Sequence, residues 1–205
     1  MKFSTLFILA ILFSFQSSEA AKKKTKPKKI VATPVAIPPK PSYKKMPLCT
    51  GNETMPGWSL ILDRSFIFPT KFVHPANYRL AMTNDTLLKN YLKSIPFDSG
   101  NNKIILPTLI DQTLQCLEFT IQRTETMDEE LQLKYPELMS FKAFEENNHL
   151  NVARIDCDGV NTKIMITYNN KVYYLTSLLF HDHTYYVAYT KDDPNFQKEN
   201  IEGRK

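Results

Sequence analysis

The sequence predicts an α+β fold in which N-terminal helices pack on a C-terminal antiparallel meander sheet of about four or five strands. Three observations predict this class. Residues 85–95 place their apolar side chains on one helical face, and a capping-box pattern indicates a second helix near residue 126. From residue 140 onward, segments rich in β-forming residues alternate with short polar breaks.

The first helix is expected over residues 85–95. Asn84 or Asp85 can accept hydrogen bonds from the free amides of the first turn, and Pro96 ends the helix. The apolar residues that share its buried face are Leu87, Leu88, Tyr91, Leu92 and Ile95.

Residues 108–122 fit two patterns. The spacing of Ile110, Leu114, Leu117 and Ile121 suits a helix, whereas residues 117, 119 and 121 alternate as in a strand. The length of the segment favours a helix over residues 108–122.

A short acidic helix is expected next. Thr126 and Glu129 have the spacing of a capping box, in which the hydroxyl and the carboxylate each cap a free amide. This helix should run to about Tyr135, because Pro136 follows.

The remaining elements are predicted strands. Residues 58–62 can begin one, and five more follow at 141–145, 150–157, 163–168, 172–180 and 184–190. Short polar breaks such as Asp158-Gly159 and Asn169-Asn170 between them indicate hairpins.

The last two predicted strands are apolar on both faces. In residues 184–190, Tyr185, Val187 and Tyr189 share one face, and Tyr186 and Ala188 share the other. One face can pack on the helices. The other would line a pocket, form a dimer face or lie under the N-terminal segment.

Residues 1–20 have the order of a signal peptide, with Lys2, a short apolar run and small residues at Ser18 and Ala20. We expect cleavage after Ala20. The apolar run is shorter than a membrane-spanning helix requires, so no transmembrane anchor is expected and the mature chain should be secreted.

Residues 21–47 are interpreted as a disordered Lys/Pro-rich arm, followed by a single globular domain over residues 48–196 and a polar tail over residues 197–205. Residues 21–45 hold nine lysines and no acidic residue, whereas residues 46–205 hold 16 basic and 20 acidic residues. A basic arm therefore precedes a mildly acidic domain.

Three roles for the arm remain open: a solvated linker, attachment to an extracellular polyanion, and a segment removed by processing. The secretory route argues against a nucleic-acid partner. The candidate polyanion contacts are Lys22, Lys23, Lys24, Lys26, Lys28 and Lys29.

Asn52 and Asn84 each begin an N-x-[ST] triplet and are candidate N-glycosylation sites. Cys49, Cys116 and Cys157 are the disulfide candidates. Three cysteines allow three different internal pairings. The third cysteine then either remains a free thiol or forms a disulfide that links two chains into a dimer.

His181 and His183 are the only closely spaced histidines. They could bind one metal ion or, with Asp156, Asp158 or Asp182, form a hydrolase site, but further metal ligands and nucleophile motifs are missing. We therefore assign no catalytic residue, metal or cofactor.

The sequence thus predicts a secreted, N-glycosylated, non-enzymatic domain that binds an extracellular protein or polyanion. The alternatives are a secreted hydrolase with a site near residues 181 and 183, and a carrier of a small apolar ligand.

Overall fold

The computed structural model describes residues 43–62, 66, 68–69, 74–97, 100–125 and 127–195, which all lie in one compact unit, Lys40–Lys205. The expected signal peptide, nearly all of the expected arm and the C-terminal tail lie outside the described residues.

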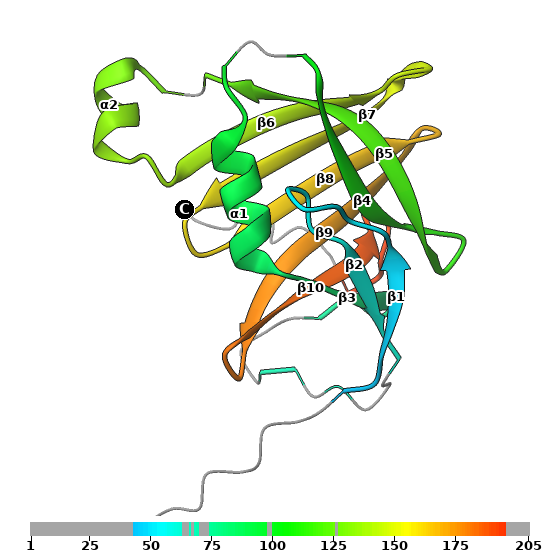
Figure 1. Ribbon diagram of the computed structural model, residues 1–205. Helices are drawn as coiled ribbons and strands as arrows, with labels where there is room; N and C mark the ends of the chain where they lie inside the picture. Colours follow the sequence, from blue (N-terminus) through cyan, green and yellow to red (C-terminus); the bar gives the residue numbers. More distant parts are fainter. Residues whose placement is uncertain are drawn as a thin grey trace, which may run out of the picture. The chain divides into compact units, whose positions relative to one another are not determined.

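The described chain forms one antiparallel sheet of ten strands and two short helices (Figure 1). In chain order the elements are β1 (Lys45–Cys49), β2 (Trp58–Ile61), β3 (Tyr78–Thr83), α1 (Asp85–Ser94), β4 (Asn102–Ile110), β5 (Thr113–Thr124), α2 (Glu129–Lys134), β6 (Leu138–Glu145), β7 (Asn148–Asp158), β8 (Thr162–Tyr168), β9 (Lys171–Phe180) and β10 (His183–Thr190).

Two meanders make up the sheet. Strands β1 to β3 form the first, strands β4 to β10 form the second, and pairing of β3 with β10 joins them. The sheet curls so that β4, at one edge, lies close to β1, β9 and β10. The result is a nearly closed barrel.

The predicted α+β fold is wrong, because the N-terminal half contributes five strands and not a layer of helices. The largest error concerns residues 108–122, where β4 and β5 form a hairpin instead of a helix. Its turn, Asp111-Gln112, has positive φ at both residues, and neither is the glycine or asparagine that usually marks such a turn.

Other local predictions are confirmed. Helix α1 begins after Asn84, whose side chain accepts a hydrogen bond from the amide of Leu87. The five strands predicted after residue 140 are β6 to β10, joined as an antiparallel meander. Helix α2 is also present, but Asp128, not Thr126, caps it.

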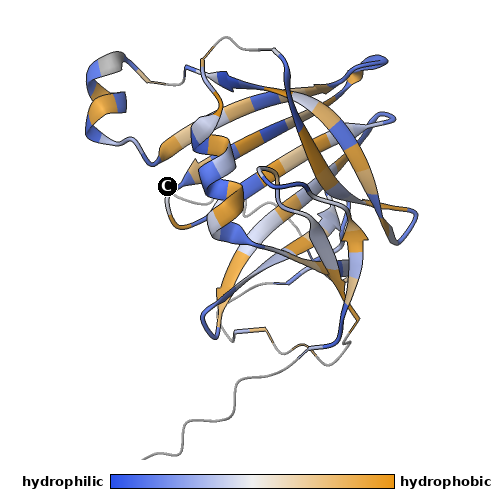
Figure 2. Ribbon diagram, viewed as in Figure 1, coloured by the Kyte–Doolittle hydropathy of each residue, from blue (hydrophilic) through white to orange (hydrophobic). Residues whose placement is uncertain are grey.

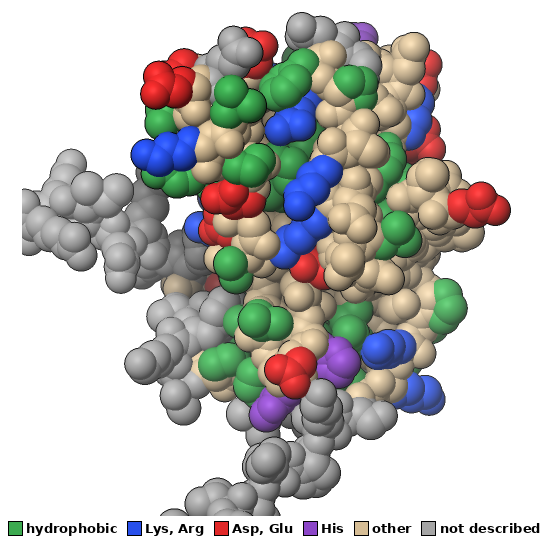
Figure 3. All heavy atoms as spheres, turned by 60° about the vertical axis from the view of Figure 1, so that its left-hand side comes forward, with side chains coloured by type: hydrophobic (Ala, Val, Ile, Leu, Met, Phe, Trp, Pro, Cys, Tyr) green, Lys and Arg blue, Asp and Glu red, His purple; other side chains and the backbone are tan. Residues whose placement is uncertain are grey.

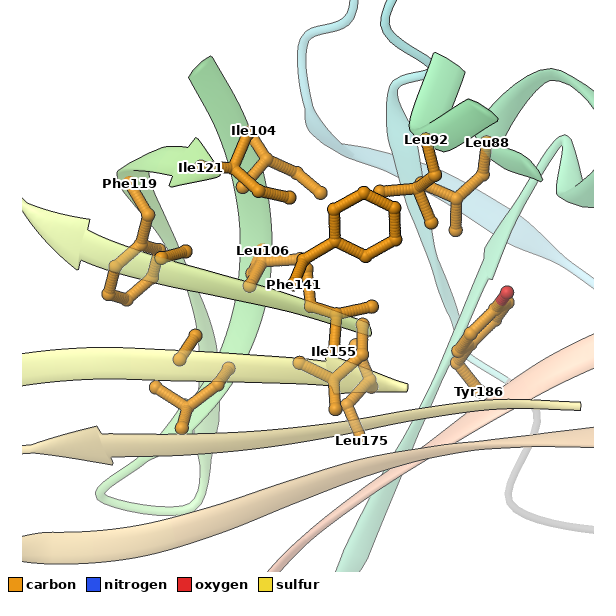
Figure 4. Packing of buried hydrophobic residues seen from close by; sticks show 14 of the residues in the cluster. Leu88, Leu92, Ile104, Leu106, Phe119, Ile121, Phe141, Ile155, Leu175 and Tyr186 are labelled. Carbon is orange, nitrogen blue, oxygen red and sulfur yellow. The ribbon is translucent and has the colours of Figure 1, made fainter. Parts of the chain in front are cut away.

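Helix α1 crosses the inner side of the curled sheet and fills the barrel. Leu88, Leu92 and Ile95 are almost fully buried and pack among inward-facing side chains such as Phe141 and Ile155 (Figure 4). The alternation of apolar and polar residues along the strands is visible in Figure 2. The interior is therefore a side-chain core.

Side chains close the seam between the first meander and β4. The Trp58 indole Nε1 donates a 2.8 Å hydrogen bond to the carbonyl of Ile105 on β4, and the Tyr91 hydroxyl donates to the carbonyl of Lys103. A disulfide between Cys49 on β1 and Cys116 on β5 crosses the same seam. Two carbonyls of β4, those of Lys103 and Ile105, are thus paired without a neighbouring strand.

We predict that the Cys49→Ala/Cys116→Ala variant is less stable than the parent chain. The bridge closes a loop with a sequence separation of 67 residues, and restraint of the unfolded chain by a loop of this length contributes about 4 kcal/mol. Urea unfolding under non-reducing conditions measures the difference. Cys157→Ala, which leaves the bridge intact, is the control, and an equal loss in both variants would contradict the role of the bridge.

Candidate functional site

Strands β9 and β10 carry a second apolar cluster on their outer face. Tyr185, Val187 and Tyr189 are buried there with Leu80 of β3. Tyr43 and Phe66 cover this face, with ring centroids 5.8 Å and 4.8 Å from that of Tyr185. Of the three outcomes open for the two-sided sheet, packing under the N-terminal segment is confirmed.

The cover continues toward β3. The Phe68 ring stacks on His74 with centroids 4.8 Å apart, and it meets Tyr78 edge to face at 4.9 Å. We call Tyr43, Phe66, Phe68 and His74 the aromatic cover. It occupies the face that a dimer or a ligand would otherwise use.

Asp193 fixes the end of the aromatic cover. Its carboxylate accepts hydrogen bonds from the amides of Ala76 (2.8 Å), Asn77 (2.7 Å) and Asn195 (3.0 Å), and the residue is only 5% exposed. Burial by itself would raise the pKa of Asp193. The three amides together with His74 outweigh burial and hold the pKa below its ordinary value.

His181 and His183 lie in the hairpin that joins β9 to β10. His181 and Asp182 have the positive φ angles of a tight hairpin turn, and both histidines are exposed. The His181 ring meets Phe180 at 4.1 Å, and His183 faces Tyr185 at 6.4 Å. The two rings therefore rest on aromatic neighbours in the same hairpin.

The carboxylates considered with these histidines have structural partners. Asp156 accepts from the Ser140 hydroxyl at 2.6 Å and pairs with Arg154 at 3.0 Å. Asp158 accepts from the amides of Asn161 and Val160, and these bonds hold its pKa below the usual value. Among the described residues, no three His, Cys, Asp or Glu side chains come together as metal ligands.

The cysteine pairing is Cys49 with Cys116, one of the three alternatives. Cys157 remains a buried free thiol on β7, next to the Thr162 hydroxyl. Burial raises the pKa of this thiol to about 11.

Both sequon asparagines are exposed and use Oδ1 for local structure. Asn52 Oδ1 accepts from the amides of Thr54 and Met55, and Asn84 caps α1. In the hydrogen bonds described for these two asparagines, Oδ1 is the acceptor, and glycosylation at Nδ2 remains a prediction.

Helix α2 projects from one end of the sheet (Figure 1) and belongs to the connection between β5 and β6, residues 125–137. We call this segment the α2 rim. One of its residues, Met127, borders a hollow of about 310 Å³, which is otherwise lined by residues at the start of β6, the end of β7 and the start of β8. The other hairpins of the second meander use turns of two residues or, between β7 and β8, three residues, so this connection is far longer than strand pairing requires.

A second hollow, of about 430 Å³, lies where β2 and β3 diverge. Residues 60–62 line one side and residues 76–80 the other. It adjoins the loop that carries the aromatic cover.

The lysines proposed as polyanion contacts, Lys22 to Lys29, lie outside the described residues. No helix in the described part of the chain is long and apolar enough to span a membrane. Comparison of this chain with protein-family models, with curated proteins and with solved structures gave no match.

Sequence reasoning predicted helix α2 but missed the exposed leucines of the α2 rim, and it missed the Asp193 anchor. One signal for the rim was available: Leu131 and Leu133 are two positions apart, so one helix face cannot bury both. For Asp193 no local signal exists, because its partners at residues 76 and 77 are more than a hundred positions away.

We predict that Asp193→Asn destabilises the domain by about 1–2 kcal/mol near neutral pH, because an amide group cannot accept all three backbone bonds. A carboxyl with a lowered pKa stabilises the fold above its unfolded pKa and loses this effect as the pH falls through the folded pKa. The difference between parent and variant should therefore shrink in acid. Urea unfolding across the pH range measures it, with exposed Asp192→Asn as the matched control.

We predict that Cys157 resists alkylation in the folded chain. At about pH 8 only about one such thiol in a thousand is ionised, and the thiolate is the reactive form. Mass spectrometry after iodoacetamide treatment should show one modified cysteine only after unfolding in denaturant. Rapid modification of the native chain would show that Cys157 is accessible.

Proposed function

We propose that this chain is a secreted, non-enzymatic binding domain that recognises an extracellular polyanion or protein. The observation that carries the proposal is the filled barrel: α1 and the inward-facing side chains occupy the interior. Because the interior is filled, we expect a ligand to bind at the surface or to the segments attached to it, and not in a central cavity.

The basic arm supports a polyanion as the ligand. Residues 21–45 contribute nine lysines without an acidic residue, whereas residues 46–205 are net acidic. Electrostatic attraction to sulfated polysaccharide or to another anionic polymer would therefore depend on the arm alone. The contacts proposed are Lys22, Lys23, Lys24, Lys26, Lys28 and Lys29.

The internal disulfide supports maturation in an oxidising compartment, since such bridges persist outside the cytosol. N-glycosylation at Asn52 and Asn84 belongs to the same proposal. The hydrolase alternative has less support, because His181 and His183 pack on aromatic rings and the neighbouring carboxylates serve turns and strand pairs.

We predict that the chain from residue 21 binds a heparin column and that the chain from residue 43, which keeps Tyr43 and strand β1, flows through at physiological ionic strength, about 0.15 M. Lysine-to-glutamine substitution at the six arm contacts should release the longer chain at lower salt. Lys142→Gln/Lys163→Gln, on the sheet, is the control and should elute with the parent. Equal elution of the two chain lengths would exclude the arm as a polyanion site.

A further inference from the structure

Strand β3 has a free stretch of edge beside β2. The two strands pair from Trp58 with Thr83 to Leu60 with Ala81, and then they diverge. Strand β3 extends further, and its residues 78–80 pair with β10 on one edge but not with β2 on the other. The hollow of about 430 Å³ lies at this divergence. A strand edge that is open over three residues therefore borders the hollow.

The alternation of backbone groups along the strands places two amide donors at this open edge. The Leu62 amide donates to β1, so Ser59, three residues earlier, directs its backbone groups toward β3. Its partner there is Met82. Leu80 and Tyr78, two and four residues before Met82, therefore direct their amides toward the hollow. Among the described residues, neither amide has a hydrogen-bond partner.

These two amides favour a bound acceptor. Leu80 is only 3% exposed, and buried backbone donors are nearly always paired with protein or with water. Water can serve the amides in the free chain. An extended peptide would serve them better, because alternate residues of a strand present their carbonyls to the same edge.

The aromatic cover closes the outer face of the sheet here but leaves the hollow open. Phe66 and Phe68 belong to the connection between β2 and β3, and they pack on aromatic residues of β10 and β3. Neither of them lines the hollow. Its border includes Leu62, which is 40% exposed, and the exposed Arg79. A peptide can therefore reach the open edge from solvent.

The charged residues around the hollow are basic. Arg79 lines it, and Nη1 of Arg79 donates a 2.9 Å hydrogen bond to the carbonyl of Tyr78, so the guanidinium lies along the open edge. The exposed Lys44 and Lys45 lie at the start of β1, beside the end of β2. No acidic residue is among the described residues that line the hollow. The open edge is thus suited to a negatively charged partner.

The α2 rim has the opposite charge. Residues 125–137 contain five acidic residues and one lysine. In Figure 3 the side of the molecule with α2 comes forward, and acidic side chains lie over its upper part. An acidic segment would therefore be attracted to the open edge of β3 and repelled by the α2 rim.

We propose that the open edge of β3 binds an extended acidic segment of a partner protein. The segment adds as a short strand beside residues 78–80. Its carbonyls accept hydrogen bonds from the amides of Tyr78 and Leu80, and its carboxylates pair with Arg79. This site deepens the proposed binding function and rests on it, since it locates the protein partner. The basic arm takes no part, so heparin binding and strand binding can each fail alone.

Amide hydrogen exchange of the ¹⁵N-labelled chain from residue 21 tests the proposal, with a synthetic Glu/Val peptide (EVEVEV) as the probe. In the free chain, the amides of Leu80 and Tyr78 should exchange at least about tenfold faster than the amide of Ala81, which faces β10. Saturating peptide should slow exchange at Leu80 and Tyr78 by about tenfold and leave Ala81 unchanged. Peptide attracted to the arm would not protect these amides.

Two further peptides separate strand pairing from general attraction. The Glu/Val peptide methylated on alternate backbone nitrogens should give no protection, because the methyl groups block pairing with a strand edge. A Lys/Val peptide (KVKVKV) should protect Leu80 less than the Glu/Val peptide does, because its charge has the same sign as that of Arg79.

Charge reversal supplies a matched pair of variants. Arg79→Glu should weaken binding of the Glu/Val peptide by about five- to tenfold, the effect of replacing an exposed attraction by a repulsion, and should strengthen binding of the Lys/Val peptide. Lys142→Glu reverses an exposed cation on β6 and should leave both affinities unchanged. Protection of the Leu80 amide as a function of peptide concentration gives the affinities, and near-ultraviolet circular dichroism confirms that both variants fold.

Four results would overturn the proposal. Slow exchange at Leu80 and Tyr78 in the free monomer would show that the edge is already paired. Unchanged exchange with the Glu/Val peptide would show that the edge accepts no acidic strand. Equal protection by the Lys/Val peptide would show that charge does not select the partner. Protection that rises with protein concentration, together with a dimer in sedimentation, would identify a second copy as the occupant.

Discussion

Closure of the sheet is the constraint on which the rest of this structure depends. Ten antiparallel strands that curl upon themselves still have two edges, and an open edge exposes unpaired backbone groups. Here β4 is paired on one side only by β5, and Pro107 removes one of its amide donors. Trp58 and Tyr91 donate to the carbonyls of β4, and the Cys49–Cys116 bridge holds the first meander against the second. Side-chain contacts thereby close the barrel at the seam, where β4 has no strand paired to its outer edge.

The buried core follows from this closure. Trp58, which bonds to β4, also packs edge to face on Tyr186, with ring centroids 5.0 Å apart. The Tyr186 hydroxyl donates to Asp85 at the start of α1, so the seam, β10 and the helix form one connected unit. Burial raises the pKa of Tyr186, which therefore remains a hydrogen-bond donor. If the seam opened, water would reach Leu88 and Leu92, which would lose their hydrophobic stabilisation.

Local signals sufficed for some elements and not for others. The capped, one-faced helix at residues 85–95 and the hairpins after residue 140 have short-range patterns, so the sequence predicted them. Strand β3 exists because it pairs with β10, about a hundred residues away, and no local pattern records such a partner. The correct cysteine pair follows from a Cα separation of 5.8 Å that only the folded seam provides. At the surface, Leu131 and Leu133 lie two positions apart and therefore on different faces of a helix. This spacing indicated that one of the two would be exposed, but it was not used.

The segments that carry most of the net charge of the chain are not the segments that stabilise the fold. The seam, the core and the aromatic cover are held by apolar contacts, hydrogen bonds of side chains and backbone, and one disulfide, with Asp85 and Asp193 as the acidic acceptors. The net charges belong to the arm, which precedes the barrel, and to the α2 rim, a connection much longer than two neighbouring strands need. Such connections tolerate substitution because few buried contacts depend on them. Selection for binding could therefore change these two segments without weakening the fold.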